Sequence, residues 1–458
     1  MRRLDCDVLI LGGGPAGTAT ALSLLKNETR SVVIIESSNY EKARVGETLP
    51  PGIQSVLERL GVWDAFLEDE HDAAYGVASS WGSGELSDND FIYRPEGHGW
   101  HLDRKRFDSM LAREAGRQGA LLLTGSRLVG HKKSGGGRWK LRVRSGGRKT
   151  LDVSAKFVVD ATGRRAAFAC QQGAKRLVCD RLVGVFGLFT SDQDQRGTDT
   201  FTLIEACEEG WWYSAFLPNS RAVVAYMSDA DIVGRGRMCS NEQWLKRLCG
   251  AGNTSGRVAH CRLDSRLAVY PANSYRLDRV AGDGWLAAGD AASGYDPLSS
   301  AGIYKALTSG LAAARAISGH LKGEQGALEK YESSTIRSFD TYLRTRAAYY
   351  RVERRWPDSL FWKRRQLCLT LDPRQALSYD ETNVKSPLLI ERDAHQLLLP
   401  AADLTLLCRL CESPAKAHEV VRAFKARSKR AIPDEKVIMA LQGLLDRGIV
   451  KARESRVD

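Results

Sequence analysis

The chain has 458 residues, which is too long for one hydrophobic core and predicts about three domains. Apolar residues make up 43% of it and charged residues 27%, as in a globular protein, and no uninterrupted apolar run predicts a membrane span. The net charge of +12 would suit nucleic acid, a membrane surface or an acidic partner, but its local basic runs are more typical of solvated helix faces. We therefore expect no nucleic-acid partner and no membrane partner.

The chain begins with an apolar run, residues 7–11, that stops at a glycine cluster and continues as small residues through Ala21. This pattern predicts a buried strand, a tight turn and the start of a helix. Gly12, Gly14 and Gly17 have the G-x-G-x-x-G spacing, in which the first glycine permits the turn, the second lets a pyrophosphate approach the backbone and the third lets the helix pack on the strand. The free N–H groups of the helix start would hold the phosphates.

A second apolar strand, residues 32–35, ends in Glu36, where an acid accepts a ribose hydroxyl in dinucleotide folds. Together the two strands predict an ADP-containing cofactor, either FAD or NAD. The apolar stretch near the N-terminus belongs to this site and is not a cleavable signal, so we expect a cytoplasmic protein. In the loop that follows, Arg44 is a candidate phosphate partner, and an ordinary surface arginine is the alternative.

From Tyr75 to Trp100 the chain is rich in Gly, Ser, Asp and aromatic residues, which indicates an insertion away from the nucleotide fold. His98 and His101 lie there on either side of Trp100, so we assign both a substrate role, although isolated histidines are usually packing or surface residues. A helix is expected over 108–117. Three short strands should follow, near residues 128–132, 139–144 and 150–153, as an antiparallel meander.

The run Phe157–Gly163 repeats the pattern of a buried strand that ends in small residues, and should lie beside the first strand in one parallel sheet. Alternating, aromatic-rich segments over 176–275 predict a second sheet that covers the cofactor. Residues 289–302 then indicate a strand end, a loop and the start of a small-residue helix over 301–317. We expect Asp290 to meet a ribityl hydroxyl, because a charge at a buried strand end needs a partner, and the backbone of 298–302 to meet the flavin.

The remainder of the chain has two further patterns. Residues 326–366 predict helices and 373–400 an irregular segment. From residue 401, three short helices followed by a strand resemble a winged-helix module, which binds DNA or peptides or packs on a neighbour. Cys408 and Cys411 are interpreted as core thiols, and no metal site is predicted.

Three separated stretches carry a resemblance to a known family. The first is Gly12-x-Gly14-x-x-Gly17 with Glu36, the second is Asp160-Ala161-Thr162-Gly163, and the third is Gly289-Asp290 with Asp296-Pro297 and Gly302. Together they resemble the FAD-binding fingerprints of flavoprotein monooxygenases of the para-hydroxybenzoate hydroxylase type. The loop 44–51 and the segment 210–214 are similar to the branch that holds tryptophan halogenases. Within it, the chain most resembles the flavoproteins that oxygenate a peptidyl tryptophan during tryptophylquinone biogenesis, as in maturation of quinohemoprotein amine dehydrogenase.

The sequence departs from the family in two places. Flavin-dependent halogenases place an essential lysine after the Gly-Glu loop, but here no lysine occurs between Lys42 and Lys105, and Gly76 stands about where it would fall. Halogenation is therefore disfavoured. Hydroxylases of the wider family have an Asp-Gly pair that guides NAD(P)H, whereas this chain has Asp160-Ala161-Thr162-Gly163. The electron source is accordingly left open between NAD(P)H and an external reduced flavin.

The resemblance implies an α/β fold class: a Rossmann-like FAD-binding domain, a β-sheet substrate domain and a small helical, winged-helix-like C-terminal domain. The expected domains are residues 1–75 with 102–175 and 276–325 for FAD, 76–101 with 176–275 for substrate, 326–390 as a helical connector and 391–458 at the C-terminus. The implied enzyme uses FAD and molecular oxygen to hydroxylate the indole of a tryptophan in a peptide or small protein, docked partly by the C-terminal domain.

Other functions stay open at this stage. They are a halogenase or hydroxylase of a small aromatic metabolite, a geranylgeranyl-reductase-like flavoprotein and a winged-helix regulator with a redox sensor. The expected cofactor-binding residues are Gly12, Gly14, Pro15, Ala16, Gly17, Glu36, Ser37, Arg44, Arg104, Leu128, Asp160, Gly163, Asp290, Pro297, Ser299, Ser300 and Gly302. The expected catalytic residues are Glu47, His98 and His101 for proton transfer, and Trp211, Trp212 and Tyr213 for the aromatic cavity.

Overall fold

The computed structural model of this chain describes residues 3–27, 30–41, 44–147, 149–191, 199–264, 266–366, 376–379, 399–428, 430, 432, 434–446 and 449–453. The expected irregular segment 373–400 lies mostly outside the described residues. The chain forms two compact units. The first comprises residues 1–177, 182–207 and 211–337, and the second comprises 178–181, 208–210 and 338–458. The domain boundaries expected from the sequence stay a prediction.

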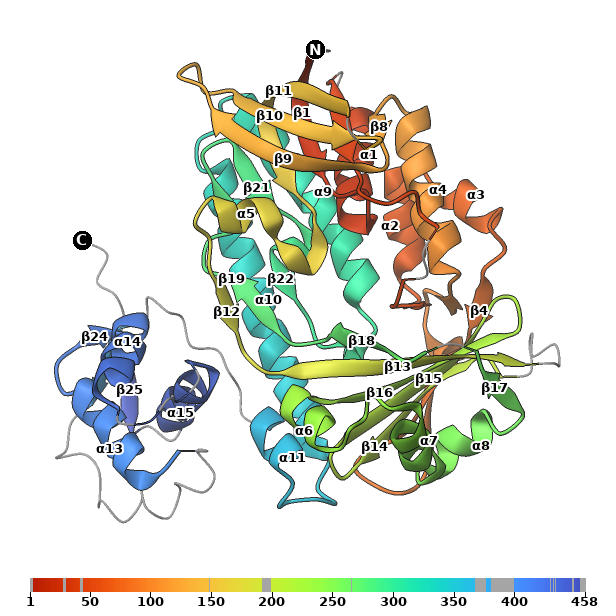
Figure 1. Cartoon of the computed structure of the whole chain (residues 1–458), viewed down its shortest axis with the longest axis vertical. Coiled ribbons are helices and arrows are strands. Elements are labelled where there is room, and N and C mark those ends of the chain that lie inside the picture. The colour runs from red at the N-terminus through yellow and green to blue at the C-terminus, as the bar shows by residue number, and fades with distance from the viewer. Residues whose placement is uncertain are drawn as a thin grey trace. The chain divides into compact units, whose positions relative to one another are not determined.

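A five-stranded parallel array forms the centre of the first unit (Figure 1). Its order is β21 (Trp285–Ala287), β11 (Lys149–Asp160), β1 (Arg3–Leu11), β2 (Val32–Ile35) and β8 (Leu121–Leu123). β1 pairs with β11 so that Leu11 lies opposite Asp160, which confirms the expected neighbourhood of the first strand. Val8 to Leu11 and all of β2 are buried, as parallel strands covered on both faces require.

Short antiparallel strands extend this sheet on the side of β11 that faces away from β1. β20 (Ala281–Gly282) pairs with β21, while β9 (Ser126–Lys133) and β10 (Trp139–Ser145) continue from β11. The expected meander is confirmed. However, its third strand and the expected parallel strand are one continuous element, because β11 pairs with β10 on one side and with β1 on the other along shared residues.

Helices pack on the parallel array. α1 (Pro15–Asn27) and α9 (Gly302–Leu321) lie against each other, and their small residues let the two backbones approach closely. Around them are α2 (Ile53–Leu60), α3 (Trp63–Leu67), α4 (Arg104–Arg117) and α5 (Ala167–Gln171). α4 starts before the expected residue 108, because the side chain of Asp103 accepts hydrogen bonds from the backbone N–H groups of Lys105 and Arg106.

The second large sheet of the first unit confirms the sheet expected over residues 176–275. Its order is β17 (Cys261–Leu263), β13 (Leu182–Ser191), β16 (Arg221–Asp229), β15 (Gly210–Leu217), β14 (Phe201–Cys207), β5 (Gly76–Ser80) and β6 (Ser87–Asp90), with β18 (Ala268–Pro271) also on β13. One face packs on α6 (Ala230–Arg235), α7 (Asn241–Cys249) and α8 (Gly252–Arg257), with Trp212, Tyr226 and Trp244 in that core.

Smaller elements connect the sheets. One three-stranded sheet consists of β3 (Thr48–Leu49), β7 (Gly99–His101) and β4 (Asp72–Ala74), and another of β12 (Arg176–Val178), β19 (Tyr275–Leu277) and β22 (Ser293–Gly294). Single turns of 3-10 helix cover Phe91–Tyr93, Gly163–Arg165, Gly289–Ala291 and Pro297–Ser299.

The second unit has its own small core. After α10 (Ala327–Val352) and α11 (Leu360–Arg365) come α13 (Ala401–Leu410), α14 (Ala417–Arg427), α15 (Asp434–Asp446) and β25 (Val450–Arg453). This order confirms the three helices and strand expected from residue 401. The sequence did not predict β23 (Ala376–Tyr379), which pairs with both β24 (Ala415–Lys416) and β25. Cys408 and Cys411 are buried free thiols in this core, as expected.

None of the helices in the described part of the chain has both the length and the apolar character that a membrane crossing requires.

The contact between α1 and α9 gives a test of the packing. A Cβ added at Gly310 would lie 2.7 Å from the carbonyl oxygen of Ala16, so we expect G310A to lower the free energy of unfolding by about 1–3 kcal/mol. G116A is the matched control, because Gly116 lies in α4 with no neighbouring atom within 4 Å and should stabilise by about 0.5–1 kcal/mol. Denaturant titration measures both, and a neutral G310A would contradict the close packing.

Candidate active site

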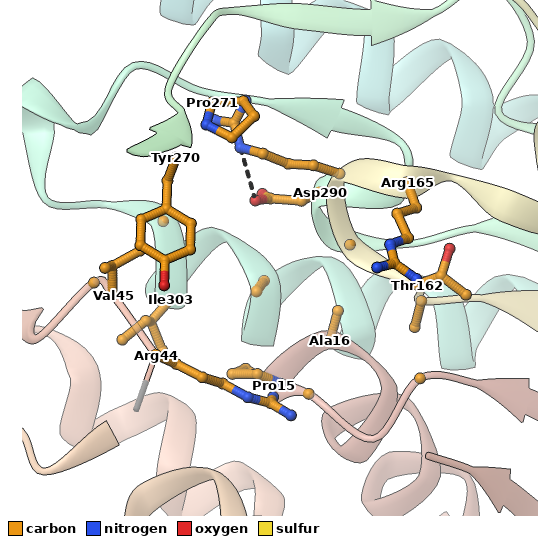
Figure 2. A pocket seen from close by; sticks show the side chains of 18 of the residues that line it. Pro15, Ala16, Arg44, Val45, Thr162, Arg165, Tyr270, Pro271, Asp290 and Ile303 are labelled. Atoms are coloured by element: carbon orange, nitrogen blue, oxygen red, sulfur yellow. Dashed lines mark ion pairs between the residues drawn. The ribbon is translucent and has the colours of Figure 1, made fainter. Parts of the chain in front are cut away.

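Four strand ends meet at one edge of the parallel sheet. Gly12 follows β1, Glu36 follows β2, Ala161 follows β11 and Ala288 follows β21. Because these strands run in the same direction, their carboxyl ends lie side by side, which is where open α/β sheets bind ligands. A cavity of about 690 Å³ lies there, and Figure 2 shows Pro15, Thr162 and Asp290 on its walls.

The first turn has the conformation that its glycines predict. Gly12 has φ +109°, and a Cβ there would lie 2.2 Å from the carbonyl oxygen of Ala161, so the turn presses directly on the loop after β11. A Cβ at Gly17 would lie 1.9 Å from the carbonyl oxygen of Gly12. In contrast, a Cβ at Gly14 would face the cavity, with only Arg44 Nη1 within 4 Å, at 3.8 Å.

Glu36 organises the loop beside the turn. Its Oε2 accepts a hydrogen bond from the N–H of Gly13 at 2.7 Å, and its Oε1 accepts one from the N–H of Ser38 at 2.8 Å. Arg44 donates to Ser38 Oγ at 2.8 Å. Glu36 therefore lines the cavity as a carboxylate held by backbone donors at the end of β2.

Two arginines of the cavity wall share one buried carboxylate. Arg44 Nη1 lies 2.8 Å from Oδ2 of Asp108, and Arg104 Nη2 lies 3.1 Å from Oδ1 of the same residue, which is 1% exposed. Arg104 also donates to the carbonyl oxygens of Val45 and Gly46, at 2.6 and 2.8 Å. Arg44 Nη2 also lies 3.5 Å from Oε1 of Glu36, so two carboxylates offset the two guanidinium charges. The two guanidinium groups remain the kind of donor that recognises a phosphate.

The opposite wall carries Asp290, whose partners the sequence did not name. Lys305 Nζ lies 2.7 Å from Oδ1 of Asp290, and Arg164 Nε lies 3.8 Å from Oδ2, an ion pair marked in Figure 2. Burial alone would raise the pKa of Asp290, but Lys305 and Arg164 outweigh it and lower the pKa below its usual value. Asp290 is thus an anion at the strand end where a hydroxyl-bearing ligand would lie.

Glu47 is the acid with a pKa near neutrality in the cavity wall. Its side chain is buried, which raises its pKa to about 7, while the charge of Arg104 opposes that shift. Its Oε2 accepts a hydrogen bond from the N–H of Gly46 at 2.9 Å. A carboxyl group with this pKa can take up or release a proton at physiological pH.

Side chains of the second sheet close the remaining side of the cavity. They come from β13, β15, β16 and β18, and are Phe186, Tyr213, Met227 and Tyr270. Figure 2 shows Tyr270 opposite Ile303 and Val45. This wall is aromatic and apolar, while the opposite wall is polar, so the cavity has two chemically distinct halves.

Most of the expected site residues are brought together here. Those that line the cavity are Gly12, Gly14, Pro15, Ala16, Glu36, Ser37, Arg44, Glu47, Arg104, Leu128, Gly163, Tyr213, Asp290, Pro297, Ser300 and Gly302. Their individual roles in binding stay predictions.

Three expected cofactor residues do not line the cavity. Asp160 is fully buried, and its carboxylate accepts hydrogen bonds from the backbone N–H groups of Thr162, Phe168 and Ala169, so it holds the loop and the start of α5. Gly17 packs beneath Gly12. Ser299 is exposed, although its neighbours Pro297 and Ser300 line the cavity.

Four expected catalytic residues also lie away from the wall. Trp212 packs between Tyr226 and Trp244 on the far face of the second sheet, and Trp211 is fully buried with Trp81 nearby. They differ from Tyr213 in that neither side chain reaches the cavity. The ring of His98 contacts the ring of Trp100 edge to face, with the ring centroids 4.6 Å apart. His101 is buried and does not line the cavity, and burial lowers its pKa to about 3. An imidazole with so low a pKa is a weak base, so the structure does not favour the proton-transfer role expected of His101, which stays a prediction.

Sequence reasoning missed other parts of the wall, namely Arg164, Phe186, Met227, Tyr270 and Tyr295. Arg164 directly follows the Asp160–Gly163 turn, so its position beside a strand end was a usable signal. The aromatic residues gave no such signal, because alternation along a strand does not say which face meets the cavity.

The residues present fit a dinucleotide. An open backbone cradle at Gly14, the start of α1 and the basic wall of Arg44 suit a pyrophosphate, and Glu36 lies where a ribose would be held. Among the described residues, no group of three or more His, Cys, Asp or Glu side chains is arranged to hold a metal ion.

Comparisons with known proteins agree with this geometry. A family described as FAD binding domain matches residues 5–341. The putative FAD-dependent oxidoreductase LodB of Marinomonas mediterranea is 31% identical over 365 residues, which span 78% of this chain and 96% of that protein.

Solved structures show the same fold. The myxobacterial chondrochloren halogenase CndH has a TM-score of 0.72 at 20% identity, covering 96% of this chain and 97% of the other. The peptidyl tryptophan dihydroxylase QhpG, described as essential for tryptophylquinone cofactor biogenesis, has a TM-score of 0.64 at 23% identity, covering 79% of each chain. At these identities the likeness concerns the fold, which is the mixed α/β class expected from the sequence.

The raised pKa of Glu47 predicts a pH-dependent stability. A carboxyl group with a higher pKa in the folded state stabilises the fold at low pH, and this contribution is lost as pH rises through about 7. E47Q removes that loss. The free energy of unfolding of E47Q minus that of the parent protein should therefore be about 1–3 kcal/mol larger at pH 8 than at pH 5. Denaturant titrations at both pH values measure this difference. The exposed Glu68 provides the control E68Q, and equal behaviour of the two variants would contradict the burial of a titrating Glu47.

Proposed function

Because the chain belongs to the FAD-binding domain family, we propose that it is a monooxygenase that hydroxylates the indole of a tryptophan within a peptide or small protein, during formation of a tryptophylquinone cofactor. At the coarser level, the chain is a flavin-dependent oxidoreductase-type enzyme with the fold shared by FAD-dependent halogenases and hydroxylases. The choice of tryptophan, of oxygen and of a peptide is the proposal.

The polar half of the cavity would hold FAD. The turn Gly12–Ala16 would meet the pyrophosphate, Glu36 a ribose, and Arg44 would offset phosphate charge. Asp290 would accept a ribityl hydroxyl, and the backbone from Pro297 to Gly302 would approach the flavin ring. Bound FAD supplies the redox chemistry, in which electrons pass from a reductant to molecular oxygen. NAD(P)H and an external reduced flavin are the two candidate electron donors.

The apolar half would receive the indole. Phe186, Met227 and Tyr270 offer surfaces on which an aromatic ring can pack, and a ring bound there would displace water from them. Replacing a ring hydrogen by a hydroxyl group releases a proton, and Glu47 is the acid in this wall with a pKa of about 7. We therefore assign proton uptake at this stage to Glu47 rather than to His98 or His101.

The observation that carries hydroxylation is that no lysine lines the cavity, within the part of the chain that the structure describes. Halogenases of the resembling branch need a lysine in the segment after the Gly-Glu loop, and this chain has none between Lys42 and Lys105. Gly76 of β5, which stands about where that lysine would fall, packs against the ring of Phe201 instead.

Halogenation of an aromatic substrate is the second candidate. The likeness to CndH favours it, because that fold match covers 96% of this chain, whereas the match to QhpG covers 79%. Docking of a peptide by the C-terminal part, residues 391–458, belongs to the first proposal. The winged-helix-like order of its described elements supports it, since such modules hold peptides as well as DNA.

Substitution of Gly14 tests the cofactor cradle. A methyl group there touches no protein atom closer than 3.8 Å but occupies the space of the pyrophosphate, so G14A should leave the unfolding free energy of the FAD-free protein within about 0.5 kcal/mol. We expect its FAD affinity to fall by about tenfold or more, as measured by titration of the flavin absorbance. G116A serves as the control, and an unchanged affinity in G14A would place the phosphates elsewhere.

The mass of a peptide substrate tests the reaction itself. Protein, FAD, a reductant and oxygen are incubated with a tryptophan-containing peptide, in buffer with chloride and bromide. We expect the mass to rise by one or two oxygen atoms, and a peptide with phenylalanine in place of tryptophan to stay unchanged. A mass increment of chlorine or bromine would favour the halogenase. Turnover of free tryptophan but not of the peptide would remove the role of a peptide. Reduction of an isoprenoid lipid without oxygen uptake would overturn the proposal.

A further inference from the structure

A chain of buried polar groups runs from the cavity wall into the protein. Tyr213 Oη lies 2.8 Å from Thr48 Oγ1, Thr48 Oγ1 lies 3.4 Å from Thr202 Oγ1, and Thr202 Oγ1 lies 3.0 Å from Nε2 of His101. These four side chains come from four strands, β15, β3, β14 and β7, and each is less than one tenth exposed. Buried polar groups have a definite donor and acceptor in every link, because an unmatched link is costly.

The two ends of this hydrogen-bond chain, Tyr213 and His101, lie in different surroundings. Tyr213 and Thr48 belong to the cavity wall, whereas Thr202 and His101 do not line the cavity and are almost completely buried. The imidazole can therefore influence a ligand only through the hydroxyl groups between them. This places His101 and Thr202 as positioning residues.

His101 is neutral in this environment. Burial is the main reason for its low pKa, and the positive charge of Arg257 lowers it further. Arg257 is itself held in place by Asp199 at 2.6 Å and by the carbonyl oxygen of Ser214 at 3.2 Å. A neutral imidazole has one ring nitrogen that donates and one that accepts a hydrogen bond. The hydrogen-bond chain therefore has a direction but carries no net charge.

The chemistry of the ends favours one direction. A phenol is a better hydrogen-bond donor than an alcohol, because it is the more acidic group, and an unprotonated imidazole nitrogen is a good acceptor. Tyr213 then donates to Thr48, Thr48 to Thr202, and Thr202 to Nε2 of His101. In this arrangement the single O–H hydrogen of Tyr213 is donated to Thr48. The phenolic oxygen can then only accept a hydrogen bond from a ligand.

We propose that Tyr213 accepts a hydrogen bond from an N–H group of the substrate, and that His101, acting through Thr202 and Thr48, holds it in this acceptor state. An indole ring is a planar apolar body with one N–H donor, and therefore matches a wall that combines this acceptor with Phe186 and Met227. The inference rests on the proposed function and adds the atom by which the site recognises the ring.

The test compares two rings of similar size, indole and benzothiophene, of which only indole has an N–H donor. Binding to the oxidised, FAD-loaded protein is measured by calorimetry, without turnover. The parent protein should prefer indole by about 5- to 10-fold, the value of one neutral hydrogen bond. In Y213F the preference should fall below about twofold, since the acceptor is gone.

Variants of Thr202 separate positioning from packing. T202V keeps the shape of the side chain but breaks the chain, so it should lose the preference for indole, whereas T202S restores a hydroxyl and should keep it. Thermal unfolding of each variant reports on folding, and the pair Y213F and T202S decides the outcome should T202V fold poorly. Equal preference in T202V and the parent protein, or no preference in the parent protein, would overturn the inference.

Nitrogen NMR of the imidazole supplies a readout that needs no cofactor and no reaction. The His101 signal, assigned with H101Q, should report a neutral ring with unprotonated Nε2, a state that T202S keeps and T202V changes. A protonated Nε2 would contradict the direction of the chain. Because neither measurement uses turnover, a preference for indole without hydroxylation would refute the proposed function alone, and hydroxylation without the preference would refute this inference alone.

Discussion

The parallel register of β1, β11 and β21 is the constraint on which the site depends. Hydrogen bonding of Leu11 opposite Asp160, and of Asp160 opposite Ala287, aligns the three strand ends to within a residue. Turns that are separated by more than a hundred residues in the sequence therefore meet around one cavity. The close approach of Gly12 to Ala161 is a direct consequence, because the first turn folds against the loop that follows the neighbouring strand.

Charge in this cavity is balanced at short range. Asp108 joins Arg44 to Arg104, and Asp290 faces Lys305 and Arg164, so the buried Asp108 and the partly exposed Asp290 both have cationic partners before any ligand is considered. Each arginine is oriented by its carboxylate partner, and Arg104 and Arg164 also donate to backbone carbonyl oxygens. The polar half is thereby organised for an anionic cofactor, while the apolar half depends on the second sheet.

The buried chain from Tyr213 to His101 links that second sheet to the small sheet beside it. Thr48 and His101 are paired across β3 and β7, and Thr202 and Tyr213 belong to β14 and β15. A neutral histidine at its end agrees with the assignment of proton uptake to Glu47, since the two groups have pKa values near 3 and 7 and so perform different tasks. The proposal of an N–H-bearing ring follows from the direction of this chain.

The sequence by itself determined the elements whose cause is local: the strand, turn and helix around Gly12 and Gly17, the strand that ends in Glu36, and the three helices from residue 401. In these segments glycine geometry and the spacing of apolar residues act over a few positions. It also placed Asp290 at a strand end that needs partners. Only the tertiary structure decided that Lys305 and Arg164 are those partners and that Asp160 caps α5. It also decided that Tyr213 reaches the cavity while Trp211 and Trp212 are buried away from it, and that His101 is buried and neutral. The physical reason is that burial and pairing depend on which strands become neighbours, and that information lies in contacts between residues far apart in the chain.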